Sequence, residues 1–398
     1  MHRVAWARRK QRSEASVAPA LRRAWGPCFR IALGLMAAWA SLACRERPMV
    51  EKVQITPHLA FSGAQGQVFS LNLQRLRTLS IYAPALEAIL DNDDRAAWHG
   101  ELAEDLGADP LVFIDRAALA FHEPFKLETP WTRCVVIAVG DFAEPERLLA
   151  GLHRFVGKRY LVNPPPFAKA SHAGHEIHVT RAPAYADPDR IIEMYFAFPT
   201  PRLMVFATGR DLIHETLEVI AGQRKGLAAP APWQDRLRRL DPAAMAWGLG
   251  LIPTEVNRWL LDKARTEPEL DGREALSLGQ EFRASLTVGR EYLLRGTIQC
   301  PSIDGAGSMA RDLEAARPIL PRILAHFLGE ESRAIPVWQG LLGRIVITSE
   351  SNTVGLILRR TRREVEDFVR EAISPPASPT PQAIPAPFLE EDPAGRHP

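Results

Sequence analysis

The sequence predicts an α+β protein with two similar lobes, each an antiparallel sheet covered by helices. Apolar and polar residues alternate in short paired runs, as they do in half-buried hairpins. Amphipathic segments follow these runs and need a sheet face to cover. Three such patterns occur in the first half of the chain and recur in the same order in the second. We therefore expect an internal duplication, with a first lobe over residues 67–240 and a second over residues 241–373.

The first repeated pattern is a strand followed by a helix. In the first copy, Gln67–Asn72 leads into a helix over Leu73–Leu90. In the second copy, Ala243–Leu249 leads into a helix over Pro253–Ala264.

The second repeated pattern is a strand pair followed by a long helix. In the first copy, Ala117–His122 and Thr132–Gly140 precede a helix that begins near Asp141, where Asp141 and Glu144 resemble a capping box.

In the second copy of this pattern, Arg283–Val288 turns at Gly289-Arg290 and returns through Tyr292–Cys300. The alternation along both runs has the period of two that a half-buried antiparallel hairpin requires. A helix follows from about Ile303.

The third repeated pattern is a hairpin followed directly by a capped helix. Thr208 with Asp211 starts one helix, and Thr361 with Glu364 starts the other. A Thr with an acid three residues later satisfies the unpaired N–H groups of a first helical turn. The paired strands are Ile191–Phe198 with Leu203–Ala207, and Arg344–Ser349 with Thr353–Arg359.

Two segments fall outside the repeat. An insertion in the first copy, about Tyr160–Asp189, is predicted to carry one extra strand at His175–Arg181. The last residues, 374–398, contain eight prolines and few large apolar side chains. Such a composition does not bury a core, so we expect a disordered tail there.

The N-terminus has the composition of an export signal. Residues 2–30 carry eight basic side chains against one acid, and the 13 residues Ile31–Ala43 carry no charge. An uncharged run of this length is too short to cross a bilayer, which takes about 20 helical residues, and it matches a signal-peptide core of about 7–15.

The segment Ala40-Ser41-Leu42-Ala43-Cys44 resembles the lipobox of bacterial lipoproteins. The resemblance implies that residues 1–43 are removed as a lipoprotein signal peptide and that a lipid is attached to Cys44. Residues 44–66 are then an N-terminal tether. Arg45 after the cysteine implies an outer-membrane location facing the periplasm. Ordinary signal cleavage, with Cys44 as a plain thiol, and a retained N-terminal anchor are the alternatives.

Charge and composition restrict the partners. Residues 1–43 hold eight positive charges and one negative charge, so the net charge of +2 for the whole chain becomes −5 for the remainder. A mildly acidic body has no general attraction for nucleic acid. The body resembles predicted lipoproteins of Gram-negative bacteria, a resemblance that implies no activity.

Cys134 and Cys300 remain in the body after Cys28 is removed and Cys44 is modified. Export permits a disulfide between them. Both lie in apolar runs of different predicted lobes, so we expect each to pack as a small buried hydrophobic residue.

The only group with metal-ligand residue types is His172, His175 and His178. Alternate residues of a strand point to opposite faces, so His175 and His178 are expected to diverge. Three imidazoles would converge only if the segment were a loop, and a surface cluster is the simpler interpretation.

Other motif-like segments have ordinary structural explanations. Gly305–Ala310 fits G-x-G-x-x-A, but the preceding strand belongs to an antiparallel hairpin, whereas dinucleotide binding needs a parallel βαβ unit. Asp91, Asp93 and Asp94 lack the central Gly and closing Glu of an EF-hand and suit a turn between helices. His214-Glu215 lacks the second His of a zinc protease.

Trp233, Trp247, Trp259 and Trp338 lie in the second lobe or at its entrance. Most such residues serve packing, and a hydrophobic groove between the lobes is the alternative.

The expected function is therefore that of a lipid-anchored cell-envelope protein acting through protein contacts or as a structural element. No catalytic residue, cofactor or metal ligand is identified, and an envelope protein partner is expected without being specified. A periplasm-facing carrier of a lipid or other apolar ligand is the alternative. An enzyme whose site is assembled from distant residues is a third hypothesis.

Overall fold

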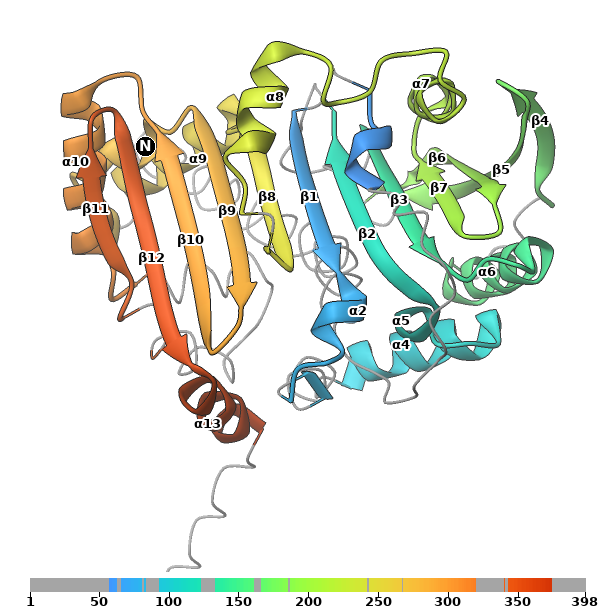
Figure 1. Ribbon diagram of the computed structural model, residues 1–398, viewed down its shortest axis with the longest axis horizontal. Coiled ribbons are helices and arrows are strands. Elements are labelled where there is room, and N and C mark those ends of the chain that lie inside the picture. Colours follow the sequence, from blue (N-terminus) through green and yellow to red (C-terminus); the bar gives the residue numbers. More distant parts are fainter. Residues whose placement is uncertain are drawn as a thin grey trace, which may run out of the picture.

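The computed structural model describes residues 57–62, 66–80, 82–83, 93–122, 133–160, 166–184, 187–241, 243–266, 268–319, 340 and 343–373. The α+β class is confirmed, with one antiparallel sheet of 12 strands where two sheets were expected (Figure 1). In spatial order the strands are β11 (Val346–Glu350), β12 (Thr353–Thr361), β10 (Glu291–Gln299), β9 (Glu281–Val288), β8 (Ala246–Leu251), β1 (Gln67–Asn72), β2 (Ile114–Phe121), β3 (Cys134–Gly140), β7 (Leu203–Ala207), β6 (Asp187–Thr200), β5 (His175–Ala184) and β4 (Ala168–His172).

The two halves of the chain join where β1 pairs with β8, in a register that sets Gln67 opposite Gly250. Gly250 has a φ of 149°, and a Cβ there would lie 2.3 Å from the carbonyl oxygen of Gly66. The strands approach this closely because residue 250 has no side chain. The expectation of two separate sheets was wrong because β1 and β8 would each be an unpaired edge, and their pairing satisfies both.

The strand order repeats on the two sides of this junction. Outward from β1 the neighbours are β2, β3, β7 and β6, and outward from β8 they are β9, β10, β12 and β11. The insertion adds β5 and β4 beyond β6, so it carries two strands where one was expected. Their tight turn places Ala173 and Gly174 at φ values of 50° and 81°.

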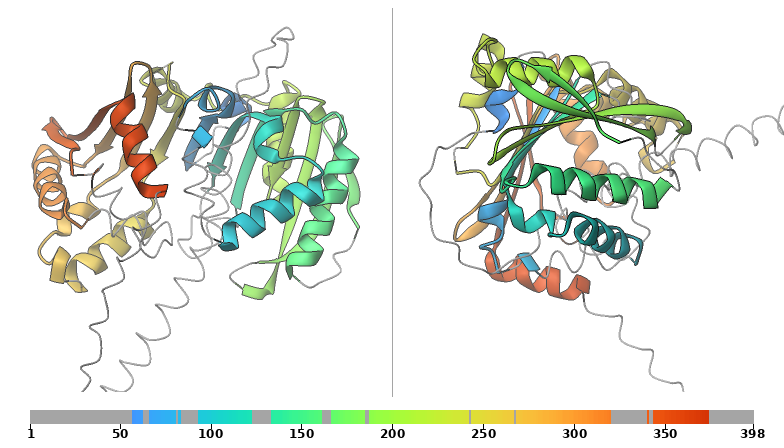
Figure 2. Two further views of the ribbon diagram at one scale, coloured as in Figure 1. Left: turned by 90° about the horizontal axis from the view of Figure 1, so that it is seen from below. Right: turned by 90° about the vertical axis from the view of Figure 1, so that its right-hand side faces the viewer.

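Helices cover both faces of the sheet. One face, covered by α7 (Arg210–Ile220) and called the α7 face, carries Val68, Ala118 and Ile137. The opposite face, covered by α6 (Pro145–Tyr160) and called the α6 face, carries Leu71, Ala117 and Ala138. The left view of Figure 2 shows α4, α6 and α9 on the same side of the sheet. The helices are α2 (Leu73–Leu76), α4 (Asp93–Leu106), α5 (Pro110–Phe113), α6 (Pro145–Tyr160), α7 (Arg210–Ile220), α8 (Ala231–Arg238), α9 (Thr254–Thr266), α10 (Ile303–Ala316) and α13 (Arg362–Ile373), with 3-10 helices η1 (Pro57–Ala60), η3 (Pro268–Leu270) and η4 (Glu274–Ser277).

The helices after the third pattern do not follow the repeat. In α7, Leu212, Ile213 and Leu217 pack in the cluster on the α7 face. In α13, Val365 packs against the cluster on the α6 face. The expectation that these two helices occupy equivalent positions was wrong, and the duplication as a whole is not shown.

The starts of these helices also differ. Thr361 and Glu364 form the expected capping box, because the Thr361 N–H donates to Glu364 Oε2 (2.8 Å) and the Glu364 N–H donates to Thr361 Oγ1 (3.2 Å). The N-cap of α7 is instead Gly209, without a side-chain hydrogen bond. The Oγ1 of Thr208 accepts from the N–H of Cys134 on β3 (2.9 Å).

Other helix boundaries differ from the prediction. Of the predicted helix over Leu73–Leu90, only Leu73–Leu76 form α2 and residues 77–80 form turns; residues 82–83 are again helical, and residues 84–90 lie outside the described residues. The helix expected near Asp141 begins at Pro145. The predicted signal peptide, Cys44 and the predicted tail after residue 373 lie outside the described residues. Within the described parts of the chain, no helix is both long and apolar enough to span a membrane.

Candidate functional site

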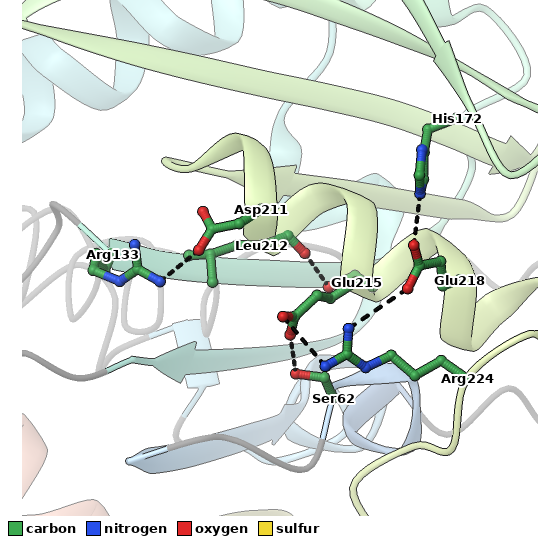
Figure 3. Close-up of polar contacts among 9 residues, drawn as sticks. Ser62, Arg133, His172, Asp211, Leu212, Glu215, Glu218 and Arg224 are labelled. Carbon is green, nitrogen blue, oxygen red and sulfur yellow. Dashed lines mark hydrogen bonds and ion pairs between the residues drawn. The ribbon is translucent and has the colours of Figure 1, made fainter.

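Polar side chains from four parts of the chain meet along helix α7 (Figure 3). The Ser62 hydroxyl donates to Glu215 Oε2 (2.7 Å). Arg224 places one guanidinium nitrogen 3.3 Å from Glu215 and another 3.5 Å from Glu218. Glu218 also lies 2.9 Å from Nε2 of His172 in β4. We call Ser62, His172, Glu215, Glu218 and Arg224 the α7 clamp.

Helical spacing explains why α7 presents this row. Asp211, Glu215 and Glu218 are four and three residues apart, so they share one side of the helix. Leu212, Ile213 and Leu217 occupy the other side and are at most 2% exposed. Asp211 extends the row, because it forms an ion pair with Arg133 at 2.6 Å.

The segment before β1 is part of the folded body. Phe61 is completely buried among the residues of the α7 face. Ser62 forms an isolated antiparallel bridge with Gly226, and the His58 ring packs edge-on against Trp247 at 4.8 Å. Pro57–Ser62, which belong to the predicted tether over residues 44–66, are therefore docked beside α7.

Hydrogen bonds, burial and neighbouring charges shift the pKa of three groups along α7, namely Asp211, His214 and Glu218. The hydrogen bond with His172 lowers the pKa of Glu218, and Arg224 acts in the same direction. Burial would raise the pKa of Asp211, but the hydrogen bond and charge of Arg133 hold it below the ordinary value. The rings of His172 and His214 stack at 3.9 Å, and burial together with His172 lowers the pKa of His214.

The α7 clamp is better suited to holding segments of the chain together than to catalysis. Ser62 donates to a carboxylate, as an activated nucleophile would, but it is only 1% exposed, so a substrate has no access to its hydroxyl. Glu215 and Glu218 are already bound by Arg224. The clamp ties the N-terminal segment, the β4–β5 hairpin and the loop after α7 to one helix.

The predicted divergence of His175 and His178 is confirmed, because they lie three residues apart in strand β5 and so point to opposite faces. His172 contacts α7, whereas His178 lies 6.2 Å from the ring of Phe198 on the other face of the sheet. His175 is in register with His172 across the turn. Among the described residues, no group of three or more His, Cys, Asp or Glu side chains is placed to hold a metal ion.

The other motif-like segments are parts of ordinary secondary structure. Gly305 lies in the first turn of α10, where its N–H donates to the N-cap Ser302 (3.0 Å) after the antiparallel strand β10. Asp93 begins α4, and Asp91 lies outside the described residues. His214 and Glu215 belong to the α7 row.

The tryptophans do not converge on one groove. Trp233 is 4% exposed in the cluster on the α7 face, and Trp247 packs against that cluster. Trp259 lies in α9, with the Lys263 ammonium 5.9 Å from its ring, and Trp338 lies outside the described residues. Packing therefore explains Trp233 and Trp247.

Cys134 and Cys300 are buried in separate clusters and are not joined by a disulfide, so the expected role as small buried residues is confirmed.

Sequence reasoning missed most of the clamp. The spacing of Asp211, Glu215 and Glu218 was the available signal. No sequence signal pointed to Ser62, which is 153 residues from Glu215, or to Arg133, which lies outside the clamp and is 78 residues from Asp211.

Comparison with known proteins identifies a distant similarity of fold. No protein-family model matches the chain, and no curated protein matches it in sequence. Crystal form III of TP0453 is similar over 80% of this chain and 99% of that chain, with 9% identity and a TM-score of 0.42. Crystal form I of TP0453 is similar over 82% of this chain and 100% of that chain, with 10% identity and a TM-score of 0.36. This similarity concerns the fold alone.

Proposed function

We propose that this protein is held in the cell envelope, at the outer membrane and facing the periplasm, by a lipid on Cys44. It then acts through protein contacts or as a structural element. The observation that carries the proposal is the lipobox-like segment Ala40–Cys44, which follows a basic and then an uncharged run.

The docked segment Pro57–Ser62 supports this arrangement. Twelve residues, 45–56, separate Cys44 from Pro57. Fully extended, they reach about 40 Å. A lipid on Cys44 would therefore keep Pro57 within about 40 Å of a membrane surface, and the α7 clamp would connect this attachment to the sheet.

Mass spectrometry of the membrane fraction tests the anchor. We expect the mature chain to begin at Cys44 with a diacylglycerol adduct, and Cys44→Ala to remove the adduct and release the chain from the membrane. Cys28→Ser, in the segment predicted to be removed, is the control and should change neither result. A chain that begins at Met1, or an unmodified mature N-terminus, would contradict the proposal.

The second candidate function is transport of a lipid or other apolar ligand. The observation that favours it is Leu294, which is 38% exposed on the α6 face of β10. Native mass spectrometry of the chain purified from its host would show a co-purified small amphiphile if this function is correct.

We also propose that the two strand sets arose by duplication of a five-stranded unit. The support is the equal strand order and the placement of α6 and α10, whose Leu148 and Met309 pack on the same sheet face. Independent sequence profiles of the two halves, built from relatives, should align strand by strand. Profiles that fail to align would reject the duplication.

A further inference from the structure

Within the part of the chain that the structure describes, two buried polar side chains on the α6 face have polar atoms without a hydrogen-bond partner. Arg360 in β12 is 8% exposed, and its Nη1 donates only to the carbonyl oxygen of Arg359 (3.0 Å). Among the described residues, its Nε and Nη2 have no partner, and neither has the hydroxyl of Tyr292, also 8% exposed.

These groups lie side by side. Tyr292 of β10 is directly opposite Arg360 of β12 in the antiparallel register. Opposite residues of such a pair share a face, with Cβ atoms about 5 Å apart. A guanidinium and a phenol hydroxyl, both hydrogen-bond donors, therefore stand together on the α6 face.

The nearby carboxylates are already occupied. Glu364 accepts from Thr361 and lies 3.3 Å from Arg344, and Glu366 accepts from Ser80. Burial, together with Arg344, lowers the pKa of Arg360 against the smaller opposing effect of Glu364. A guanidinium keeps its proton, and a buried charge without a partner is destabilising, so a bound anion would offset this cost.

An apolar surface begins at the next residue pair along the same face. Leu294 is opposite Leu358 on one side and Leu286 on the other. Leu294 is 38% exposed, so this row is accessible immediately beside the buried cation. A ligand that matches both features has one anionic group and an apolar chain.

We propose that Arg360 and Tyr292 bind the carboxylate or phosphate group of an amphiphile whose apolar chain lies along Leu286, Leu294 and Leu358. Charge-assisted hydrogen bonds to Arg360 provide specificity for the anion. This inference is independent of the lipid on Cys44 and gives the alternative carrier function a definite ligand class.

Calorimetric titration of the purified full chain tests the ligand class. The probes are dodecanoate and dodecyl phosphate, each below its micelle concentration, with the neutral dodecyl maltoside and inorganic phosphate for comparison. We expect both anionic amphiphiles to bind at least about tenfold more tightly than either comparison probe. Equal affinity for dodecyl maltoside would overturn the anion site, and equal affinity for inorganic phosphate would overturn the amphiphile assignment.

Matched variants test the residues. Arg360→Gln should weaken binding of dodecyl phosphate about tenfold or more, the effect of losing a charge-assisted hydrogen bond. Arg359→Gln removes the same charge from the next residue, which faces the other side of the sheet beside Glu291, and should leave the affinity unchanged. If Arg360→Gln does not fold, Tyr292→Phe decides, because it removes only the hydroxyl. Unchanged affinity in Tyr292→Phe would then overturn the proposal.

Discussion

His122, at the end of β2, is a buried histidine whose protonation opposes folding. It is 6% exposed, and among the described residues its Nε2 has no hydrogen-bond partner. Burial, reinforced by the charge of Arg133, lowers its pKa from 6.5 to about 4, although Asp211 acts in the opposite direction. The unfolded chain therefore binds a proton at a higher pH than the folded chain does.

Because of His122, we expect the unfolding free energy of the protein to fall in acid. Its contribution is fully present above pH 6.5 and is lost as the pH falls toward 4, because protons bind the unfolded state preferentially. We expect His122→Gln to reduce the decrease in unfolding free energy over that range by about 3 kcal/mol. Urea denaturation at several pH values measures it, with His175→Gln as the control for loss of a histidine. An unchanged pH dependence in His122→Gln would contradict the prediction.

At the scale of elements, the same sequence pattern produced two different helix starts. Thr361 and Glu364 cap α13 reciprocally. Thr208 has an acid at the same spacing, but β7 places it beside β3, where its side chain accepts from the N–H of Cys134. A neighbouring strand competes with the helix for a Thr hydroxyl, so a capping pattern predicts the helix more reliably than it predicts the cap.

The cap of α13 can be tested alone. Thr361→Ala should lower the unfolding free energy by about 1 kcal/mol, because the N–H of Glu364 loses its acceptor. Arg363→Ala in the same turn is the control, since that side chain is 91% exposed, and it should change the value by less than about 0.5 kcal/mol. Equal values for the two variants in urea denaturation would mean that the capping box contributes nothing.

At the scale of the whole molecule, the β1–β8 junction makes the two halves one folding unit. Val68 and Leu249 pack in the cluster on the α7 face, and Leu71 and Val288 pack in the cluster on the α6 face. Each of these two clusters therefore contains residues from both halves of the chain, so separating the halves would expose side chains in both.

Gly250→Ala tests whether the two halves of the chain unfold together. The added Cβ would meet the backbone at Gly66 and Gln67, and the φ of 149° is unfavourable for Ala, so we expect destabilisation of about 2 kcal/mol or more. Hydrogen exchange should accelerate in both β3 and β10, which lie in different halves. Gly289→Ala, in a turn with open space around its Cα, is the control and should change neither the stability nor the hydrogen exchange of β3 and β10. Acceleration confined to one half would show that the halves unfold independently.

The sequence by itself determined the local elements of this protein. Apolar runs and, in the hairpin of β9 and β10, period-two alternation located the described strands outside the insertion to within a few residues, with β1 and β7 at their observed bounds. The Thr361–Glu364 pattern located the start of α13 and its cap. These features depend on neighbours a few residues apart, so a single sequence contains them. The segment Ala40–Cys44 likewise predicts the anchor from local chemistry.

Only the tertiary structure decided how these elements combine. Between β1 and β8, the Gln67 side chain donates to the carbonyl oxygen of Leu251, 184 residues away, and no local pattern distinguishes an edge strand from a central one. The opposite faces of α7 and α13 depend on what else covers the sheet. The α7 clamp and the Arg360–Tyr292 pair likewise bring together residues from distant segments. Sequence periodicity records which side chains are buried, but the partners of those side chains depend on the packing of the whole chain.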